Sequence, residues 1–337
     1  MRTTDLLSTI EAAYRVEASD AEWLAGLAAA CLPVLDRGLG ICAFEFHYRV
    51  GDTPRILQAQ MLGMPEELAR LYPTVFRSMP PEIQIRPFLA GPCTTASQMM
   101  GEASHFKKNE LMQRYAQKFG MYDSIWITAA EPSGWGCGLH AGRPQVGRAS
   151  RGTIARWARI AAHFAAAARL RRTFPRSPRS PLPVLGSAAA VFSTNGKVHH
   201  AEGEAKEAQA IERLRQSVLD IEKARRHRSE DASKGLFRWR ALVDGRWSLV
   251  DRFESDSRRY VVARENPPNP PGIEGLSLRE RQVVAYAALG HDNKVIAYDL
   301  GIAHSTVRVL MARAAAKLNV TTREKLVAAY RDQCHRV

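Results

Sequence analysis

The sequence predicts a multidomain protein in which an α+β region is followed by an all-α domain of four helices. Apolar residues recur at three- and four-residue spacing along about residues 278–330, which is the pattern of short amphipathic helices. Before residue 266, groups of strand-like runs are separated by groups of helical runs, as in α+β folds. Proline is dense at 174–183 and 266–271 and cannot continue a helix or a central strand, so these segments separate the domains.

The chain of 337 residues is long enough for each of three domains to bury its own core. We expect two α+β domains, at residues 1–173 and 187–265, and a helical domain at 276–337. A linker rich in proline and arginine, 174–186, joins the first two domains, and a proline-rich linker, 266–275, precedes the third.

The first domain begins with a helix that Ser19 caps and ends with a long alanine-rich helix. The expected helices lie at 19–35, 66–71, 110–119 and 151–172, and the expected strands at 41–48, 56–59, 124–128 and 137–140. The helix at 151–172 has two interpretations that the sequence leaves open. Either the helix packs on the sheet of its own domain and closes that domain, or it forms a dimer contact or transmits a signal.

The second domain starts with a strong hairpin signal. Asn195-Gly196 lies between two short strand-like runs, and this dipeptide favours the tight turn of a two-residue hairpin. The expected elements are strands at 190–192 and 197–200, a charged helix at 207–227, and strands at 237–242, 247–251 and 259–263. The domain therefore combines a hairpin, one helix and a three-stranded meander.

The third domain carries signals for the ends of its helices. Ser277 and Glu280 fit a capping box, in which each side chain accepts a hydrogen bond from the other residue's backbone amide. Gly290 is expected to end the first helix, Asp292 to cap the second, and Gly301 to make the turn after it. The third helix then runs from about residue 304 to 317, and a fourth from about 323 to 330.

The third helix is expected to have one buried and one outward face. The buried face repeats at helical spacing and consists of Val307, Met311, Ala314 and Leu318. The outward face near the start of the helix consists of Ser305, Arg308, Val309 and Ala312. This arrangement predicts a helix-turn-helix, whose second helix enters the major groove of double-stranded DNA with its N-terminal residues.

Five short motifs in this domain resemble the LuxR-type DNA-binding domain. In order, they are Leu276-Ser277-Leu278-Arg279-Glu280, Asn293-Lys294-Val295-Ile296-Ala297, Leu300-Gly301-Ile302, Thr306-Val307-Arg308 and Lys317-Leu318-Asn319-Val320. The resemblance covers about residues 276–330. It implies a four-helix helix-turn-helix that binds double-stranded DNA as a homodimer, with the fourth helix forming the dimer contact.

The resemblance also implies which residues meet DNA. Arg308 and Val309 approach the bases, whereas Lys294 and Thr306 lie close to the phosphate backbone. The candidate DNA-binding residues are Lys294, Ser305, Thr306, Arg308, Val309 and Ala312. The competing interpretation of Arg308 and Lys294 is that each lies on a solvated helix face.

Three residues depart from the family pattern. Ala303 stands where a serine usually caps the recognition helix, which removes about 1 kcal/mol of stabilisation unless Ser305 caps it instead. Leu310 replaces a frequent histidine, and Ala312 replaces a frequently polar residue. We therefore expect base recognition through fewer hydrogen bonds, with contact from Val309 or Ala312 to a thymine methyl group as the substitute.

In the order of their elements, the two preceding domains resemble sensor domains. Residues 1–173 are similar to a GAF domain, or to the related autoinducer-binding domain of quorum regulators, and residues 187–265 to a PAS domain. The predicted fold class is thus an α+β GAF/PAS-like sensor region followed by an all-α four-helix LuxR-type domain.

These resemblances imply that the sensor region binds an unidentified small-molecule ligand. The candidate ligand-binding residues are Phe44, Phe46, Trp126 and Trp135. In the alternative interpretation these aromatic residues form domain cores, and the two domains are a constitutive scaffold for dimerisation or protein interaction without a ligand.

The composition favours a polyanionic partner and a reducing compartment. The formal net charge of +14 favours association with nucleic acid through the release of counterions. The five cysteines include no Cys-x-x-Cys pair, and the chain shows neither an apolar signal segment nor an apolar stretch of membrane-spanning length. We therefore expect a cytoplasmic protein without membrane association.

No pattern in the sequence supports catalysis, a metal site or a cofactor. The glycine-rich run at 134–138 lacks the helix that follows a phosphate-binding loop. Cys137 with His140 lacks the second ligand pair of a zinc site, and His199-His200 is typical of an exposed hairpin. The first domain also lacks the alternating strands and helices of a phospho-receiver. We expect a protein that is not an enzyme.

Overall fold

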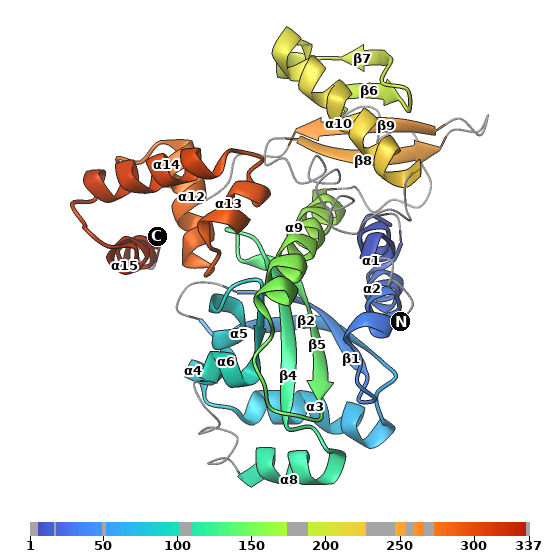
Figure 1. Ribbon diagram of the computed structural model, residues 1–337, viewed down its shortest axis with the longest axis vertical. Coiled ribbons are helices and arrows are strands. Elements are labelled where there is room, and N and C mark those ends of the chain that lie inside the picture. Colours follow the sequence, from blue (N-terminus) through green and yellow to red (C-terminus); the bar gives the residue numbers. More distant parts are fainter. Residues whose placement is uncertain are drawn as a thin grey trace.

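A computed structural model of the chain describes residues 6–16, 18–48, 52–100, 110–173, 188–226, 247–253, 259–265 and 273–334. Figure 1 shows a large α+β unit, with a smaller α+β unit above it and a helical unit beside it. The structure thus confirms an α+β region followed by a helical C-terminal domain.

The first unit is built on a five-stranded antiparallel sheet with the strand order β2-β1-β5-β4-β3. Its strands are β1 (Ile41–His47), β2 (Arg55–Leu62), β3 (Cys93–Thr95), β4 (Asp123–Ala130) and β5 (Trp135–Arg143). Its helices are α1 (Leu6–Ala13), α2 (Asp20–Leu35), α3 (Glu66–Ser78), α4 (Pro81–Gln84), α5 (Arg86–Leu89), α6 (Ala96–Met100), α8 (Glu110–Phe119) and α9 (Arg151–Thr173).

The two faces of this sheet support two separate cores. Successive side chains of a strand point to opposite faces, so a single strand contributes to both. Ile41 and Ala43 of β1 pack with α1, α2 and α9, whereas Phe44 and Phe46 pack with Phe88 of α5 on the other face. The helix α9 packs on β3, β4 and β5 and therefore closes its own domain.

Most long elements of the first unit were predicted, whereas the short ones were not. The predicted helix at 66–71 continues through Pro73 to Ser78. The elements that the sequence did not predict are α1 and the elements of three to five residues, β3, α4, α5 and α6. Segments this short contain too few residues to establish a helical or strand period.

Within its described residues, the second unit contains a four-stranded antiparallel sheet in the order β7-β6-β9-β8, with one long helix. The elements are β6 (Ala190–Ser193), β7 (Val198–Ala201), the 3₁₀-helix η2 (Gly203–Lys206), α10 (Ala208–Arg226), β8 (Trp247–Phe253) and β9 (Arg259–Glu265). The predicted hairpin forms at Gly196, whose φ is +82°. The strand predicted at 237–242 lies outside the described residues.

The C-terminal unit consists of four helices, with ends close to the predicted ones. They are α12 (Leu278–Ala288), α13 (Asn293–Asp299), α14 (His304–Lys317) and α15 (Arg323–Cys334). Gly290 and Gly301 have φ angles of +83° and +64°, as their predicted roles at helix ends require. Only α15 is clearly longer than predicted.

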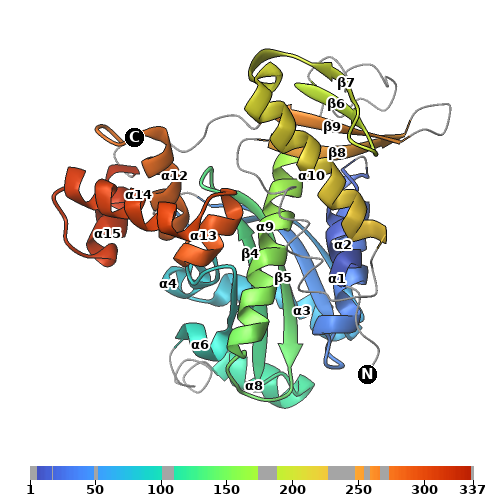
Figure 2. The ribbon, with the colours of Figure 1, turned by 45° about the horizontal axis from the view of Figure 1, so that its top comes forward.

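The C-terminal unit is docked on the first unit. Figures 1 and 2 both show α13 lying against α9. The backbones of Gly91 and Gly290 also meet so closely that a Cβ atom on Gly290 would lie 2.4 Å from the carbonyl oxygen of Leu89. The core on the α5 side of the sheet continues from Phe88 into the helices of the C-terminal unit.

Within the described residues, no single helix combines the length and the apolarity needed to cross a membrane. The helices α13 and α14 pass the same test only as a joined pair, which is bent by 107°.

Candidate nucleic-acid interface and ligand cavity

The carboxylate of Glu280 links the first and third helices of the C-terminal unit. It accepts hydrogen bonds from the Ser277 amide and from Lys317 Nζ, both at 2.7 Å. These contacts, with that of Lys317 the larger, lower the pKa of the Glu280 carboxyl. The capping box is thus present as predicted, and its acidic member also fixes the C-terminal end of α14.

A side-chain cap likewise starts α13. The Asp292 carboxylate accepts hydrogen bonds from the amides of Lys294 and Val295 at 2.8 and 2.9 Å. This confirms the predicted cap and leaves the side chain of Lys294 exposed.

The recognition helix α14 begins without a side-chain cap. Its N-cap residue, Ala303, has extended backbone angles (φ −69°, ψ 147°) and makes no side-chain hydrogen bond. Ser305 lies inside the first turn of the helix, so it does not replace the missing cap.

The faces of α14 largely match the prediction. Val307, Met311 and Ala314 are buried as predicted, whereas Leu318 is the C-cap residue of the helix and is only half-buried. The candidate residues on the outward side are all exposed, namely Ser305, Thr306, Arg308, Val309 and Ala312. Val309 is 48% exposed, so its apolar side chain is accessible from the outward side of the helix.

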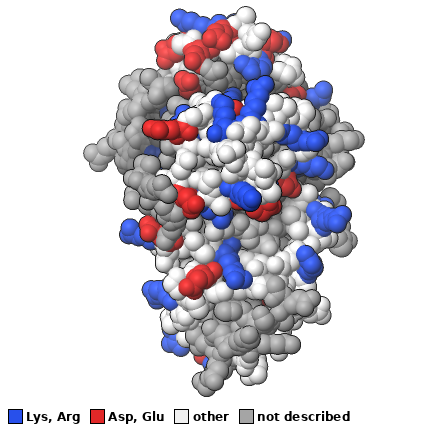
Figure 3. Space-filling view, turned by 90° about the vertical axis from the view of Figure 1, so that its left-hand side faces the viewer, with Lys and Arg blue, Asp and Glu red and all other residues white. Residues whose placement is uncertain are grey.

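The surface around α14 is basic. No acidic residue occurs between Asp299 and Glu324. Arg308, Arg313 and Lys317 of α14 are exposed. Figure 3 views the side of the molecule that carries the helical unit, and Lys and Arg side chains outnumber acidic ones over it. This electrostatic balance favours a polyanion at the outward face.

A cavity of about 520 Å³ opens on the first unit between β2 and α3. This volume is within the usual range of small-molecule sites. Phe44 and Trp126, two of the candidate ligand-binding residues, line it together with Tyr72 and Phe76. The ring centroids of Phe44 and Trp126 lie 6.1 Å apart in an edge-to-face arrangement.

The other two candidate residues lie elsewhere. Phe46 is fully buried, and its ring packs edge-to-face on Phe88 with centroids 4.6 Å apart. Trp135 is 37% exposed at the start of β5, where it contacts His47 and the guanidinium of Arg172. The alternation of side chains along β1 puts Phe44 and Phe46 on one face of the sheet, but no sequence pattern indicates that α3 lies beside Phe44 and not beside Phe46.

A smaller cavity of about 40 Å³ adjoins the large one and shares Tyr72, Phe76 and Trp126 with it. His140 lines this inner cavity and is 3% exposed, and its Nδ1 has no hydrogen-bond partner within the described residues. Burial lowers the pKa of His140 to about 3, so the ring is neutral at physiological pH.

Within the described residues, no group of three or more His, Cys, Asp or Glu side chains is placed to hold a metal ion. Four of the cysteines are buried. Burial raises the pKa of the Cys93 thiol to about 12, so this group is poorly suited to act as a nucleophile.

Residues 274–329 match the family model of the luxR family of bacterial regulatory proteins. Over 55 residues the chain is 47% identical to the transcriptional regulatory protein FixJ of Azorhizobium caulinodans, and this alignment covers 16% of the chain and 26% of FixJ. The chain thus spans about a quarter of the length of this curated relative. Together with the four helices described above, these similarities identify residues 274–329 as a LuxR-family helix-turn-helix domain.

Proposed function

We propose that the protein is a DNA-binding transcription regulator in which the N-terminal region senses a small molecule or partner and controls how the helix-turn-helix is presented. The main support is the start of α14, which lies within a LuxR-family domain and projects exposed polar and basic side chains away from the core. Double-stranded DNA is the partner that this geometry fits, since such a helix end enters the major groove.

The exposed residues divide into two proposed roles. Arg308, Val309 and Ala312 contact base edges, with Arg308 supplying hydrogen bonds and the other two supplying apolar contact to thymine methyl groups. Lys294 and Thr306 contact the phosphate backbone and fix the register of the domain on the duplex, and Ser305 lies on the outward face with the base-contacting residues. Two copies bind together, and the helix α15 forms their contact.

The variants Arg308→Ala and Arg308→Lys test the base contact in promoter gel-shift titrations. If Arg308 makes a bidentate base contact, Arg308→Ala weakens specific binding by about 1–3 kcal/mol. Arg308→Lys keeps the positive charge but loses the planar guanidinium that donates two parallel hydrogen bonds. This variant should therefore lose most of its preference for the operator and retain non-specific DNA binding. Unchanged operator affinity in Arg308→Ala would remove this residue from base recognition.

The cavity between β2 and α3 supports the sensory part of the proposal. A preformed, largely apolar cavity of this size suits a small-molecule effector. The effector would act by stabilising one arrangement of the first unit relative to the helix-turn-helix. The GAF-like and PAS-like character of the two N-terminal units, and a cytoplasmic location, belong to the same proposal.

The alternative function is a helix-turn-helix regulator whose N-terminal units are a constitutive scaffold. The burial of Phe46 against Phe88 favours it, because this aromatic residue belongs to the domain core. Native mass spectrometry of the purified protein distinguishes the two functions. A co-purifying small molecule supports sensing, whereas its absence together with unchanged DNA affinity in cell extract supports the scaffold.

A further inference from the structure

The register of the first sheet places one histidine in a row of otherwise apolar side chains. Paired residues of neighbouring antiparallel strands carry their side chains on the same face. Trp126 of β4 and Cys42 of β1 both pair with His140 of β5, and in turn Met61 of β2 pairs with Cys42. This row therefore lies on the face of the sheet that carries Phe44 and borders both cavities.

The charged side chains near this row are directed elsewhere. Arg55 and Gln58 of β2 pair with the two residues of β1 that flank Phe46, so their side chains lie on the opposite face of the sheet. Arg77 of α3 borders the large cavity but is exposed. The described lining of the inner cavity contains no Asp, Glu, Lys or Arg. A charged group would therefore lose its hydration there without gaining a partner.

His140 has an unsatisfied polar atom in this apolar surrounding. Its ring contacts Tyr72 and Trp126, with centroid distances of 4.9 and 4.5 Å. The indole Nε1 of Trp126 donates a hydrogen bond to Ser124 Oγ at 3.0 Å, whereas Nδ1 of His140 has no partner within the described residues. A buried imidazole without a partner is costly, so a group from outside the chain is expected to supply the hydrogen bond.

A water molecule is the simplest such partner, because the inner cavity of about 40 Å³ is large enough to hold one. The inner cavity, however, adjoins the cavity of about 520 Å³, whose largely apolar walls gain nothing from being hydrated. An apolar molecule in the large cavity can direct a hydroxyl group inward and replace the water. Neutral imidazole has one donor and one acceptor nitrogen, and a hydroxyl group can pair with either.

We propose that the two cavities form one site for a neutral phenol. The ring of the ligand lies in the large cavity against Phe44 and Trp126, and its hydroxyl group enters the inner cavity and pairs with His140. Aromatic walls favour a ring over an alkyl chain, because offset and edge-to-face ring contacts add to the burial of apolar surface. This inference rests on the proposed sensory function and specifies its ligand class.

The test uses the full chain and three probes that share a para-ethyl benzene ring: 4-ethylphenol, 4-ethylanisole and 4-ethylbenzoate. Isothermal titration should show 4-ethylphenol binding at least about fivefold more tightly than its methyl ether 4-ethylanisole, which corresponds to ~1 kcal/mol for the hydrogen bond. The anion 4-ethylbenzoate should bind more weakly than either neutral probe. In the variant His140→Phe the preference for the phenol over the ether should disappear.

His200→Phe is the matched control, because His200 is an exposed histidine on β7 of the second unit. It should bind the three probes as the unchanged chain does. Ala59 pairs with Phe44 and lines the large cavity, so Ala59→Trp should fill the cavity and abolish binding of all three probes. The unfolding midpoint of each variant shows whether it remains folded, and His140→Leu replaces His140→Phe if the larger ring prevents folding.

Equal affinity for the phenol and the ether, or a preference for the phenol that survives without His140, would overturn the proposed hydrogen bond. Binding of 4-ethylbenzoate as tightly as 4-ethylphenol would reject a neutral ligand. Failure of all three probes to bind would overturn the proposal and leave water as the partner of His140. Promoter gel shifts on the same protein report separately on the proposed function: DNA binding without probe binding rejects the ligand class alone, whereas loss of both rejects the regulator.

Discussion

At the scale of single residues, the start of α14 is a weak point in an otherwise well-capped domain. The helices α12 and α13 are capped by Ser277 and Asp292, whose side chains satisfy amides of the first turn. The helix α14 has only Ala303 at this position, and the amides of its first turn have no side-chain acceptor. In a helix that enters DNA, these free amides remain available to a phosphate group.

The substitution Ala303→Ser should therefore stabilise the C-terminal domain. The backbone at Ala303 is already extended, so a serine hydroxyl could accept a hydrogen bond from the first turn without rearrangement, and the gain should be about 1 kcal/mol. Urea denaturation would measure this gain as an increase in the free energy of unfolding. Ala316→Ser, at an exposed position in the interior of the same helix, is the control and should be slightly destabilising.

The removal of Lys294 should affect DNA affinity differently from the removal of Arg308. A lysine that contacts only phosphate contributes equally to every sequence, so Lys294→Ala should weaken specific and non-specific binding alike and reduce the salt dependence by about one counterion. Fluorescence anisotropy on operator and random duplexes, at several salt concentrations, separates the two effects. If Lys294→Ala lost affinity for the operator duplex alone, Lys294 would instead be assigned to base recognition.

The residues that the sequence analysis placed correctly are those whose role is local. Ser277, Asp292, Gly290 and Gly301 act within four residues of themselves, so their types and spacing were sufficient. The cavity depends instead on contacts across the sheet. Tyr72 and Phe76 approach Phe44 only because α3 folds back over β2, and no local pattern encodes that approach.

At the scale of secondary-structure elements, α9 is the helix of the first unit against which α13 of the C-terminal domain packs. Its small side chains, among them Ala162, allow α13 to approach, and Ala162 packs directly against Tyr298. The alanine-rich composition of this helix was visible in the sequence. The docking of α13 on it could not be predicted, because small residues are compatible with a helix packed on its own sheet, on another domain or on a second chain.

The variant Ala162→Leu should loosen this docking. The added side chain overfills a closely packed contact, which typically destabilises it by about 1–3 kcal/mol. Hydrogen exchange should become faster in α13 and at Gly290, while the sheet of the first unit remains protected. Ala155→Leu lies at an exposed position of the same helix and should change neither region. Uniform loss of protection would instead indicate that the first unit itself unfolds.

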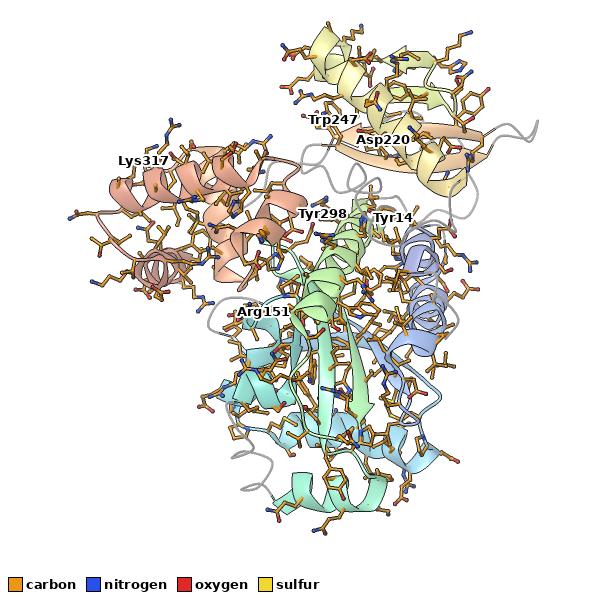
Figure 4. All side chains as sticks on the ribbon, in the orientation of Figure 1. Tyr14, Arg151, Asp220, Trp247, Tyr298 and Lys317 are labelled. Atoms are coloured by element: carbon orange, nitrogen blue, oxygen red, sulfur yellow. The ribbon has the colours of Figure 1, made fainter. Side chains whose placement is uncertain are left out.

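At the scale of the whole molecule, one buried histidine connects three separate segments of the chain. His163 of α9 shares a hydrogen bond of 2.8 Å with the Tyr298 hydroxyl of α13, and its other ring nitrogen lies 3.4 Å from the Tyr14 hydroxyl. Figure 4 shows Tyr14 and Tyr298 approaching α9 from its two sides. The docked arrangement of the C-terminal unit therefore depends on a polar contact in an apolar surrounding.

The docking should consequently depend on pH. Burial lowers the pKa of His163 from 6.5 to about 3, and the neighbouring Tyr14 has a raised pKa and carries no charge in this range. Once α13 leaves α9, His163 regains water and an ordinary pKa, so the undocked state takes up a proton below pH 6.5 and the docked state does not. Docking is therefore fully stable above pH 6.5 and loses stability as the pH falls from 6.5 toward 3.

Small-angle scattering of the full chain between pH 7.5 and 5 would detect this opening as an increase in the radius of gyration. His163→Gln keeps hydrogen-bonding groups at the site but does not titrate, so its radius should stay constant over this interval. His140 is also buried with a lowered pKa, but it lies in the core of the first unit, and its protonation should lower the unfolding temperature without undocking. An expansion that persists in His163→Gln would assign the pH response to another group.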